Sequence, residues 1–313
     1  MPQNKLLIIC GSTASGKSYL AHQLAKVHNG EVINSDSMQI YQQLPIITAS
    51  PPEIHRREIP YHLYNFLSIE QEFSVIKYVN CALEKIIEVT AKGKLPIIIG
   101  GTGLYINSLI FGYNEIPKIS AEIRQYVRDL HLNIGQIEFF NRLKELDILA
   151  GQKLHQHDTQ RVIRAFEVFM QTGKSIFHFH ACHPPPILLG FDYKVIFLHP
   201  ERKFLYQTCN DRLKALFNAG AIEEVELMIK NLPDSYLHTS AGKTIGVREI
   251  TSYLKGKITL EEAINLAQIK TRQYAKRQIT WFKNQIDNKI TLEYSDKLEF
   301  EQIINSLIQS LPF

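Results

Sequence analysis

Cysteine is scarce in this sequence, and its placement argues against a scaffold built on cysteine. The 313 residues include Cys10, Cys81, Cys182 and Cys209, which lie far apart and form no CxxC pair. Structural zinc sites and small disulfide-stabilised domains use closely spaced cysteines. We therefore expect neither a disulfide framework nor a cysteine zinc site, and the pattern favours a reducing cytosol.

Long apolar runs are also missing. No stretch approaches the roughly 18 apolar residues that a membrane span requires, and MPQNKLLIICGS leads into a strand and a loop rather than resembling a signal peptide. Fixed-period repeats and low-complexity segments are absent from the sequence. The formal net charge of +4 is too small to indicate a nucleic-acid partner by itself. We expect a cytoplasmic protein with no membrane association.

The sequence does contain short apolar runs that alternate with segments of helical spacing. Leu6–Cys10, Glu31–Asn34 and Leu95–Ile99 are predicted strands. The segments Lys17–Val27 and, approximately, Ser74–Lys92 are predicted helices between them. Strands separated by helices indicate an α/β fold with a parallel, doubly wound sheet.

This alternation stops after about residue 115. Three segments with helical spacing follow, and the last, DTQRVIRAFEVFMQTG, ends at Gly173, where a C-cap is expected. The prolines of HPPPILLG then stop helix formation. YKVIFLH predicts a returning strand, and a later helix is expected from roughly Leu260 to Asn284. We predict a core of residues 1–115 and 186–313, interrupted by an all-helical insertion of residues 116–185.

Residues 11–18, GSTASGKS, match the phosphate-binding pattern G-x-x-x-x-G-K-[ST] between a strand and a helix, as this motif requires. Glycines let backbone amides face an anion, the helix N-terminus adds partial positive charge, and Lys17 adds a full charge. Ser18 can reach a magnesium ion. A chance match in an unrelated loop is the alternative, and the flanking strand and helix disfavour it.

The aspartate that usually accompanies such a loop is missing from its place. Most P-loop proteins that cleave ATP or GTP hold magnesium and water with an aspartate after a second strand, whereas here LPIII is followed by GGTGLY. Asp36, in EVINSDSMQIY, is the acid in a comparable position. It could be a metal ligand or a base beside the phosphate. The alternative is a helix N-cap for the segment that follows.

Six segments in this order resemble the tRNA dimethylallyltransferases, also called tRNA isopentenyltransferases. They are GSTASGKS, INSDSMQIY, GGTGLY, DTQRVIRAFEV, the spaced set Arg202, Arg212, Gly220 and Glu224-Val225, and TRQYAKRQITWF. The segments span residues 11–282, which is nearly the whole chain. A phosphate loop alone would be weak support, whereas six ordered segments are highly specific.

The resemblance implies a P-loop NTPase-like parallel sheet flanked by helices, and it implies an activity. The phosphate loop would hold dimethylallyl pyrophosphate. The acceptor would be the exocyclic amine of the adenosine immediately 3′ of the anticodon, tRNA position 37, in tRNAs that read codons beginning with U. Mg²⁺ would be the cofactor, with Ser18 as its ligand. The tRNA anticodon arm would be the macromolecular partner, and the chain is expected to be a monomer.

The resemblance also assigns site residues. Asp36 would be the general base, and Thr13 and Arg212 would act on the departing pyrophosphate. Pyrophosphate would be held by Gly11, Ser12, Thr13, Ala14, Ser15, Gly16, Lys17 and Ser18. Contacts with tRNA would come from Asp36, Ser37, Met38, Gln39, Thr102, Arg124, Gln160, Arg161, Val162, Ile163, Arg164, Lys243, Thr244, Ile245, Gly246, Val247 and Arg248. Without the resemblance, Arg212 would be favoured as a surface helix residue in an i,i+4 pair.

Some positions depart from the family's pattern. ITASP replaces GTAKP, so that Ile47 and Ser50 stand in place of a glycine and a lysine. HQHD, at residues 155–158, replaces HPND. Thr208 stands where a basic residue is often found four positions before Arg212. These changes leave the roles of the nearby loops open, while the phosphate loop and Asp36 follow the pattern.

A basic stretch without acidic residues occupies residues 263–286. Its cations are Lys270, Arg272, Lys276, Arg277 and Lys283. On a helix, Arg272, Lys276 and Lys283 fall near one face, and such a stripe supplies salt-dependent phosphate contacts. The alternative is a solvated helix face with a buried aromatic edge.

Another stretch, IFHFHACHPPP, invites a metal interpretation. It contains His178, His180, Cys182 and His183. Their alternate-residue spacing beside prolines lacks the usual paired-ligand geometry. We expect a strand or a turn in the linker there, and no metal site.

Two other functions stay open from the residues alone. A small-molecule nucleotide kinase or an adenylate prenyltransferase would use the same phosphate loop, but would require neither the helical insertion nor the basic helix. An RNA-binding, GTPase-like module would need an N-K-x-D segment for guanine, which the sequence lacks.

Overall fold

A computed structural model of the chain describes residues 4–182, 184–232 and 239–310, which divide into two compact units. One unit combines Met1–Ile110 with Ile187–Phe313, and the other is Phe111–Pro186. The sequence placed these junctions at 115/116 and 185/186. Among the described residues, no helix is both long and apolar enough to cross a membrane.

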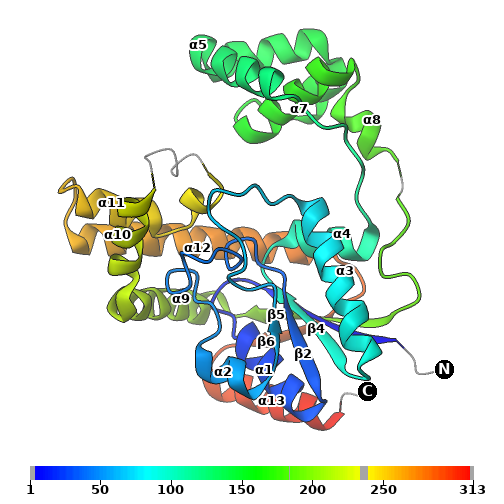
Figure 1. The fold of residues 1–313 in the computed structure, drawn as a ribbon, viewed down its shortest axis with the longest axis vertical. Coiled ribbons are helices and arrows are strands. Elements are labelled where there is room, and N and C mark those ends of the chain that lie inside the picture. The colour runs from blue at the N-terminus through cyan, green and yellow to red at the C-terminus, as the bar shows by residue number, and fades with distance from the viewer. Residues whose placement is uncertain (1–3, 183, 233–238, 311–313) are drawn as a thin grey trace. The chain divides into compact units, whose positions relative to one another are not determined.

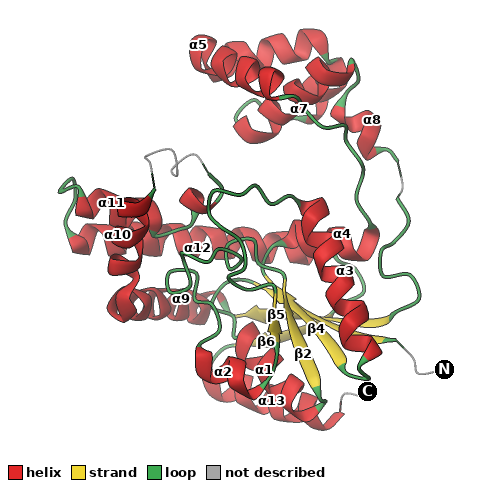
Figure 2. Cartoon of the chain, viewed as in Figure 1, coloured by secondary structure: helices red, strands yellow, loops and turns green. Residues whose placement is uncertain are grey.

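Within the described residues, six strands of the first unit form one sheet in which all neighbours run parallel (Figures 1 and 2). The strands are β1 (Lys5–Gly11), β2 (Gly30–Asn34), β3 (Tyr61–His62), β4 (Leu95–Gly100), β5 (Asp192–Pro200) and β6 (Ile290–Tyr294). Their order across the sheet is β3-β2-β4-β1-β5-β6. The predicted α/β fold, a parallel sheet flanked by helices, is confirmed.

Helices follow most of these strands. In the first unit they are α1 (Lys17–Val27), α2 (Glu53–Glu58), α3 (Val75–Ala91), α4 (Gly103–Phe111), α9 (Arg202–Leu216), α10 (Ile222–Asn231), α11 (Val247–Leu254), α12 (Leu260–Gln285) and α13 (Lys297–Ser310). A π-helical segment, η1 (Phe217–Ala221), joins α9 to α10, and the 3₁₀ segment η3 (Ala241–Lys243) precedes α11.

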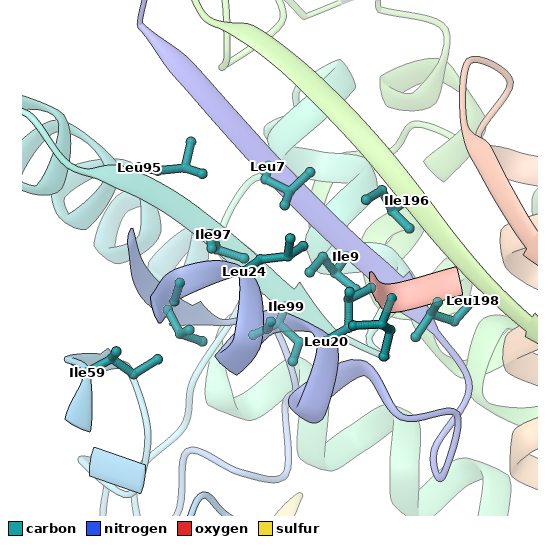
Figure 3. Packing of buried hydrophobic residues seen from close by; sticks show 14 of the residues in the cluster. Leu7, Ile9, Leu20, Leu24, Ile59, Leu95, Ile97, Ile99, Ile196 and Leu198 are labelled. Atoms are coloured by element: carbon teal, nitrogen blue, oxygen red, sulfur yellow. The ribbon is translucent and has the colours of Figure 1, made fainter. Parts of the chain in front are cut away.

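One face of the sheet is covered by α1, with α13 beside it. Figure 3 shows Leu7 and Ile9 of β1 pointing toward Leu20 and Leu24 of α1, and these side chains are fully buried. Strand residues two apart share a face, so every second residue of β1 enters this core. Burial of each such side chain stabilises the fold by about 1.5–3 kcal/mol.

Helix α12 belongs to the core on the opposite face. Phe197 alternates along β5 with Ile196 and Leu198, which belong to the α1 side, so it points to the other face. There its ring lies 5.9 Å, centroid to centroid, from that of Phe282 in α12, and Phe282 is fully buried. The expected helix from roughly Leu260 to Asn284 therefore exists, and packing on the sheet fixes its position.

The second unit is built from helices, as expected for the insertion. They are α5 (Ala121–Leu146, kinked at Gly135), α6 (Ile148–Lys153), α7 (Thr159–Thr172) and α8 (Ile176–His180). Stacked rings of Phe139 and Phe166 lie in its core. Helix α7 ends at Gly173 with a φ of 66°, which confirms the predicted C-cap.

The strand or turn expected around His178 is wrong, because Ile176–His180 form a short helix. The side chain of Ser175 accepts a hydrogen bond from the backbone N–H of Phe177 and so caps this helix. Ile176 packs into the unit's core. Local capping and burial therefore overrode the alternating pattern. His183 lies outside the described residues.

Strand order sets the position of the site. The loops after β2, β4 and β1 leave the carboxyl edge of three adjacent strands, where open parallel sheets bind ligands. The register places Asn34 beside Ile99 and Cys10 beside Gly100, so the three loops start at nearly the same level. Residues far apart in the sequence can therefore meet there.

Candidate active site

The phosphate loop, residues 11–18, turns directly into α1. Gly16 is the N-cap and has a φ of 78°, a conformation that side chains disfavour. A Cβ atom at this position would also lie 2.4 Å from the ring of Phe300 in α13. This position therefore requires glycine. Since α1 begins at the next residue, the loop ends at the amino end of a helix, which attracts anions.

Hydrogen bonds centred on Ser12 hold the loop in shape. The carbonyl oxygen of Ser12 accepts from Lys17 Nζ at 2.5 Å and from Ser15 Oγ at 2.8 Å. The hydroxyl of Tyr294, at the end of β6, donates to the carbonyl oxygen of Ser15 at 2.5 Å. The ammonium of Lys17 is thus held against the phosphate loop by its hydrogen bond to Ser12.

The electrostatics around Lys17 favour an anionic ligand. Burial, together with the positive charge of Arg212, lowers the pKa of Lys17 to about 8, and the charge of Asp36 opposes part of this change. An anion between Lys17 and Arg212 would relieve both the desolvation and the repulsion. Two partly desolvated cations around an anion-binding helix end are typical of a diphosphate site.

Arg212 reaches the phosphate loop from α9. Its Nη1 lies 3.3 Å from Thr13 Oγ1 and donates to it. The surface i,i+4 pair is therefore wrong for Arg212, and it is the neighbouring Asp211 that accepts from Gln207 in this way. Burial lowers the pKa of Arg212, and the charge of Asp36 raises it. The arrangement brings together Thr13 and Arg212, the two residues to which the family resemblance assigned a role at the departing pyrophosphate.

A pocket of about 440 Å³ opens beside the loop, which is a usual size for a small-molecule site. Residues 14–19, Thr208 and Arg212 line it together with residues 49–52, His55 and Tyr61. Two departures from the family's pattern, Ser50 and Thr208, are therefore pocket residues. The hydroxyl of Thr208 donates to backbone carbonyls of Leu205 and Ala14.

Asp36 stands in the loop after β2. Its Oδ1 accepts from the N–H of Met38 at 2.9 Å, and its own N–H donates to Asn34 Oδ1 at 2.9 Å. A turn follows, so the helix N-cap alternative is wrong. The charge of Asp36 raises the pKa of both Lys17 and Arg212. The carboxylate is therefore near enough to both cations to interact with them electrostatically.

The turn after β4 supports the Asp36 loop. Thr102 Oγ1 accepts from the N–H of Ser37 at 2.9 Å and donates to Ser37 Oγ at 3.2 Å, while the Thr102 N–H donates to the carbonyl of Ser35 at 3.2 Å. Thr102 was predicted as a tRNA contact. These bonds place it directly beside the proposed base.

The segment Lys243–Arg248 also reaches this region. Thr244 Oγ1 lies 3.3 Å from Met38 Sδ, which joins two of the stretches predicted to contact tRNA. Lys243 and Arg248 are exposed and Ile245 is half-buried. Thr244, Gly246 and Val247 are buried. The polar surface of the segment is therefore provided by its two cations.

Glu224 fixes the loop that contains the third departure, Ile47. Its two carboxylate oxygens accept from the N–H groups of Ile46 and Ile47 at 2.6 and 2.8 Å. Burial raises the pKa of Glu224, and these backbone donors lower it. Gln39 Nε2 donates to the carbonyls of Thr48 and Ala49. The loop is thus held from two sides where it borders the pocket.

The remaining predicted tRNA residues lie in the helical unit. Gln160 and Arg161 are exposed, and Arg124, Ile163 and Arg164 are half-buried. Val162 is fully buried in the unit's core, so its side chain serves packing. Arg161 pairs with Asp158 at 3.4 Å and Arg164 with Glu167 at 3.3 Å.

The predicted basic stripe on α12 is only partly a free surface. Arg272 Nη1 donates to Asn210 Oδ1 at 2.6 Å, and Lys270 pairs with the buried carboxylate of Glu249. Lys276 and Lys283 are exposed. Buried residues of α12 pack against α9 and α11 and, at Phe282, against the sheet, while its cations divide between internal bonds and solvent.

Sequence reasoning missed two residues of α12 that reach the site. Gln278 is buried and bonds to Thr13, and the pKa of Tyr274 is raised by burial and by the charge of Asp36. Both lie in the stretch TRQYAKRQITWF, whose cations were the basis of the predicted RNA contact.

The pocket could bind a divalent cation through few protein ligands, with the remaining ligands supplied by a bound diphosphate and water. Ser18 follows Lys17 at the first turn of α1 and lines the pocket. Among the described residues, no cluster of three or more His, Cys, Asp or Glu could hold a metal. One hydroxyl together with diphosphate oxygens and water is a ligand set that suits Mg²⁺.

Comparisons with known proteins identify the family of this chain. Residues 39–285 match the family described as IPP transferase. A tRNA dimethylallyltransferase of Rickettsia conorii is 59% identical over 305 residues, covering 97% of this chain and 83% of that protein. A crystal structure of the tRNA isopentenylpyrophosphate transferase of Bacillus halodurans is similar with a TM-score of 0.69 and 32% identity, covering 98% and 95% of the two chains. A eukaryotic dimethylallyltransferase acting on tRNA gives a TM-score of 0.79 and 29% identity, covering 99% of this chain and 80% of that one. The chain, with its phosphate loop, its facing arginine and its aspartate at one edge of the sheet, belongs to the IPP transferase family.

Proposed function

We propose that this enzyme transfers the dimethylallyl group of dimethylallyl pyrophosphate to the exocyclic amine of the adenosine 3′-adjacent to the anticodon, at tRNA position 37, and releases pyrophosphate. The substrates are tRNAs that read codons beginning with U. The observation that carries the proposal is the hydrogen bond of Arg212 to Thr13 beside Lys17, within electrostatic range of the carboxylate of Asp36. Lys17 and Arg212 would stabilise the leaving group, and Asp36 would act as the base for the acceptor.

The cations explain how the leaving group departs. As the bond between the allylic carbon and oxygen breaks, negative charge grows on the pyrophosphate. Lys17 and Arg212 lie where that charge develops, and the helix N-terminus at Gly16 adds to them. Groups aimed at charge that forms in the transition state lower the barrier more than they tighten substrate binding.

Asp36 supplies the base for the acceptor. The lone pair of an adenine amine is delocalised into the ring, which makes the amine a poor nucleophile. A carboxylate that accepts the proton as the new carbon–nitrogen bond forms accelerates such a step by about 10²- to 10⁴-fold. The turn that ends at Met38 holds this carboxylate in one orientation.

We further propose Mg²⁺ at Ser18. When bound, the ion would neutralise pyrophosphate oxygens and so add to the charge stabilisation. Ser18 would be its protein ligand, and Lys17 and Arg212 would hold the remaining oxygens.

The tRNA anticodon arm is the proposed partner of the exposed polar residues. A stacked adenine has to leave the stack before its amine reaches an enclosed base, so the nucleotide is extruded toward Asp36. Ser37, Gln39 and Thr102 lie around that carboxylate, and Lys243 and Arg248 add cationic surface. The helical unit contributes Gln160, Arg161 and Arg164, together with Arg124.

A labelled-substrate assay tests the proposal. The protein is incubated with Mg²⁺, labelled dimethylallyl pyrophosphate and either an anticodon stem-loop with adenosine 3′ of the anticodon or free AMP. Label in RNA alone supports the proposal. Label in AMP would support an adenylate prenyltransferase. In a parallel incubation with ATP labelled in its terminal phosphate, transfer of that phosphate to AMP would support a kinase.

The pKa of Lys17 predicts how substrate affinity depends on pH. Below about 8 the ammonium is present, so the affinity for dimethylallyl pyrophosphate should be constant. Above that pH, binding has to take up a proton, and the affinity should fall by up to about tenfold per pH unit. Equilibrium titration without RNA, from about pH 7 to about pH 10, measures this, because the ester's last phosphate ionisation lies near 6. Lys17→Met should bind weakly with a flat profile. A sloping profile in that variant would assign the titration to another group.

Arg161→Ala should weaken tRNA binding and spare dimethylallyl pyrophosphate. Arg161 is exposed, and in the described part of the chain its ion pair is a surface pair with Asp158, so its cation is available to a phosphate. Loss of one phosphate contact should reduce the slope of log affinity against log salt by about 1. Filter binding at several salt concentrations measures it. Arg142→Ala is the control, because Arg142 makes a similar surface pair with Glu138 in the same unit. Equal losses for both substrates would contradict the assignment.

A further inference from the structure

One side chain connects the two loops on which the proposed reaction depends. Gln278, on α12, accepts a hydrogen bond through Oε1 from the N–H of Thr13 at 2.8 Å. Through Nε2 it donates to the carbonyl oxygen of Gly101 at 2.8 Å. Thr13 belongs to the phosphate loop after β1, and Gly101 to the turn after β4. Gln278 is 5% exposed, so solvent does not compete for either bond.

Each end of this bridge continues to a group with a proposed chemical role. On one side, Thr13 is the residue whose hydroxyl accepts from Arg212. On the other side, Gly101 is followed by Thr102, which bonds to Ser37, the neighbour of Asp36. The amide of Gln278 therefore stands between the leaving-group side and the base side of the site.

We propose that Gln278 is a positioning residue that sets the distance between the pyrophosphate loop and the Asp36 loop, and so aligns the two halves of the transfer. This inference rests on the proposed function. Gln278 takes no part in bond making. It acts through Thr13 and through the turn at Gly101.

The residue type follows from the chemistry of the bridge. The Thr13 end needs an acceptor and the Gly101 end needs a donor, and a primary amide provides both in one rigid plane. An ionised glutamate would place an oxygen against the Gly101 carbonyl, and a methionine would serve neither end. Loss of the amide would also leave a partly buried N–H and a buried C=O without this partner.

Steric packing fixes the bridge as firmly as its hydrogen bonds do. A Cβ atom at Gly101 would lie 2.2 Å from Gln278 Nε2, and one at Gly103 would lie 2.3 Å from the Trp281 ring. Helix α12 thus contacts the turn after β4 at the closest distance that glycine permits. Burial and the charge of Asp36 also raise the pKa of Tyr274, one turn earlier, and hydrogen bonding to Gln278 opposes this change.

Gln278→Met tests the inference, because methionine keeps length and volume and removes both bonds. Misplacement of reacting groups by about 1 Å can slow an enzyme by about 100-fold, so kcat should fall by about 10- to 100-fold. The KM for dimethylallyl pyrophosphate and the Kd for the anticodon stem-loop should stay within about twofold, since no group that binds either substrate is removed.

Gln268→Met is the matched control. Gln268 is a buried amide on the same helix, 7% exposed, and donates to the carbonyl oxygen of Asn210 at 3.2 Å. Among the described hydrogen bonds it reaches neither loop. Its replacement should lower thermal stability by a similar amount and leave kcat within about twofold of the parent. A merely structural amide would give the same result at both positions.

Gly101→Ala provides a second variant in case Gln278→Met fails to fold. The added methyl group lies on the Gly101 side of the bridge and would displace Gln278 Nε2. We expect the same fall in kcat with an unchanged KM. Parental kcat in either folded variant would overturn the inference, as would equal losses in Gln278→Met and Gln268→Met. Failure of the proposed function would show differently, because the unmodified protein itself would then leave RNA unlabelled.

Discussion

Asp36→Asn should bind both substrates and transfer the prenyl group about 10²- to 10⁴-fold more slowly. Asparagine retains the Oδ1 that accepts from the N–H of Met38, so the turn is preserved while the anionic base is lost. Single-turnover transfer of labelled dimethylallyl to an anticodon stem-loop measures the chemical step directly. An unchanged rate would remove Asp36 from the mechanism.

The same substitution should also change how Lys17 titrates. The charge of Asp36 raises the pKa of Lys17, so its removal should move the loss of dimethylallyl pyrophosphate affinity to lower pH. Asp211→Asn is the control, since Asp211 is an exposed carboxylate beside Arg212 that pairs with Gln207. It should leave both the rate and the pH profile unchanged. A shift in both variants would indicate a general effect of net charge.

Local patterns in the sequence predicted much of the fold. The predicted helix Lys17–Val27 has the bounds of α1, because the phosphate-binding pattern demands a strand before it and a helix after it. The order of strands could not be read in this way, since neighbours in a sheet are chosen by packing between distant segments. The two-residue β3 and the largely exposed β6 carry too little apolar pattern to be recognised.

The same distinction holds for the site. Asp36 could be singled out because it follows a predicted strand, and strand ends of a parallel sheet share an edge. Arg212 needed the family resemblance, since nothing in NDRLKALF indicates that its partner is Thr13, 199 residues earlier. Gln278 was missed for a further reason. Its partners are backbone groups 265 and 177 residues away, and backbone groups carry no sequence pattern.

Arg212→Met should slow transfer by about 10²- to 10³-fold, which is the usual effect of losing one donor that stabilises transition-state charge. The guanidinium reaches Thr13 Oγ1 from α9 and faces the charge of Asp36, so its loss removes positive charge where the pyrophosphate departs. Arg212→Lys should recover only part of the rate, because a lysine offers a point charge without the planar fork. Steady-state kinetics with dimethylallyl pyrophosphate as the varied substrate measure kcat and KM separately.

The partner hydroxyl decides how Arg212 acts. Thr13→Val removes the acceptor that orients the guanidinium, and if the two residues work as a unit, the double variant should be little worse than Arg212→Met alone. Arg272→Met is the matched control, since Arg272 bonds to Asn210 of the same α9 helix but contacts no residue of the phosphate loop among the described hydrogen bonds. A loss confined to KM in Arg212→Met would mean that the arginine binds substrate and transition state equally. If Thr13→Val shows the same loss in kcat, Thr13 and Arg212 act together on the leaving group. Charge that grows during bond cleavage is what distinguishes the transition state from the bound substrate.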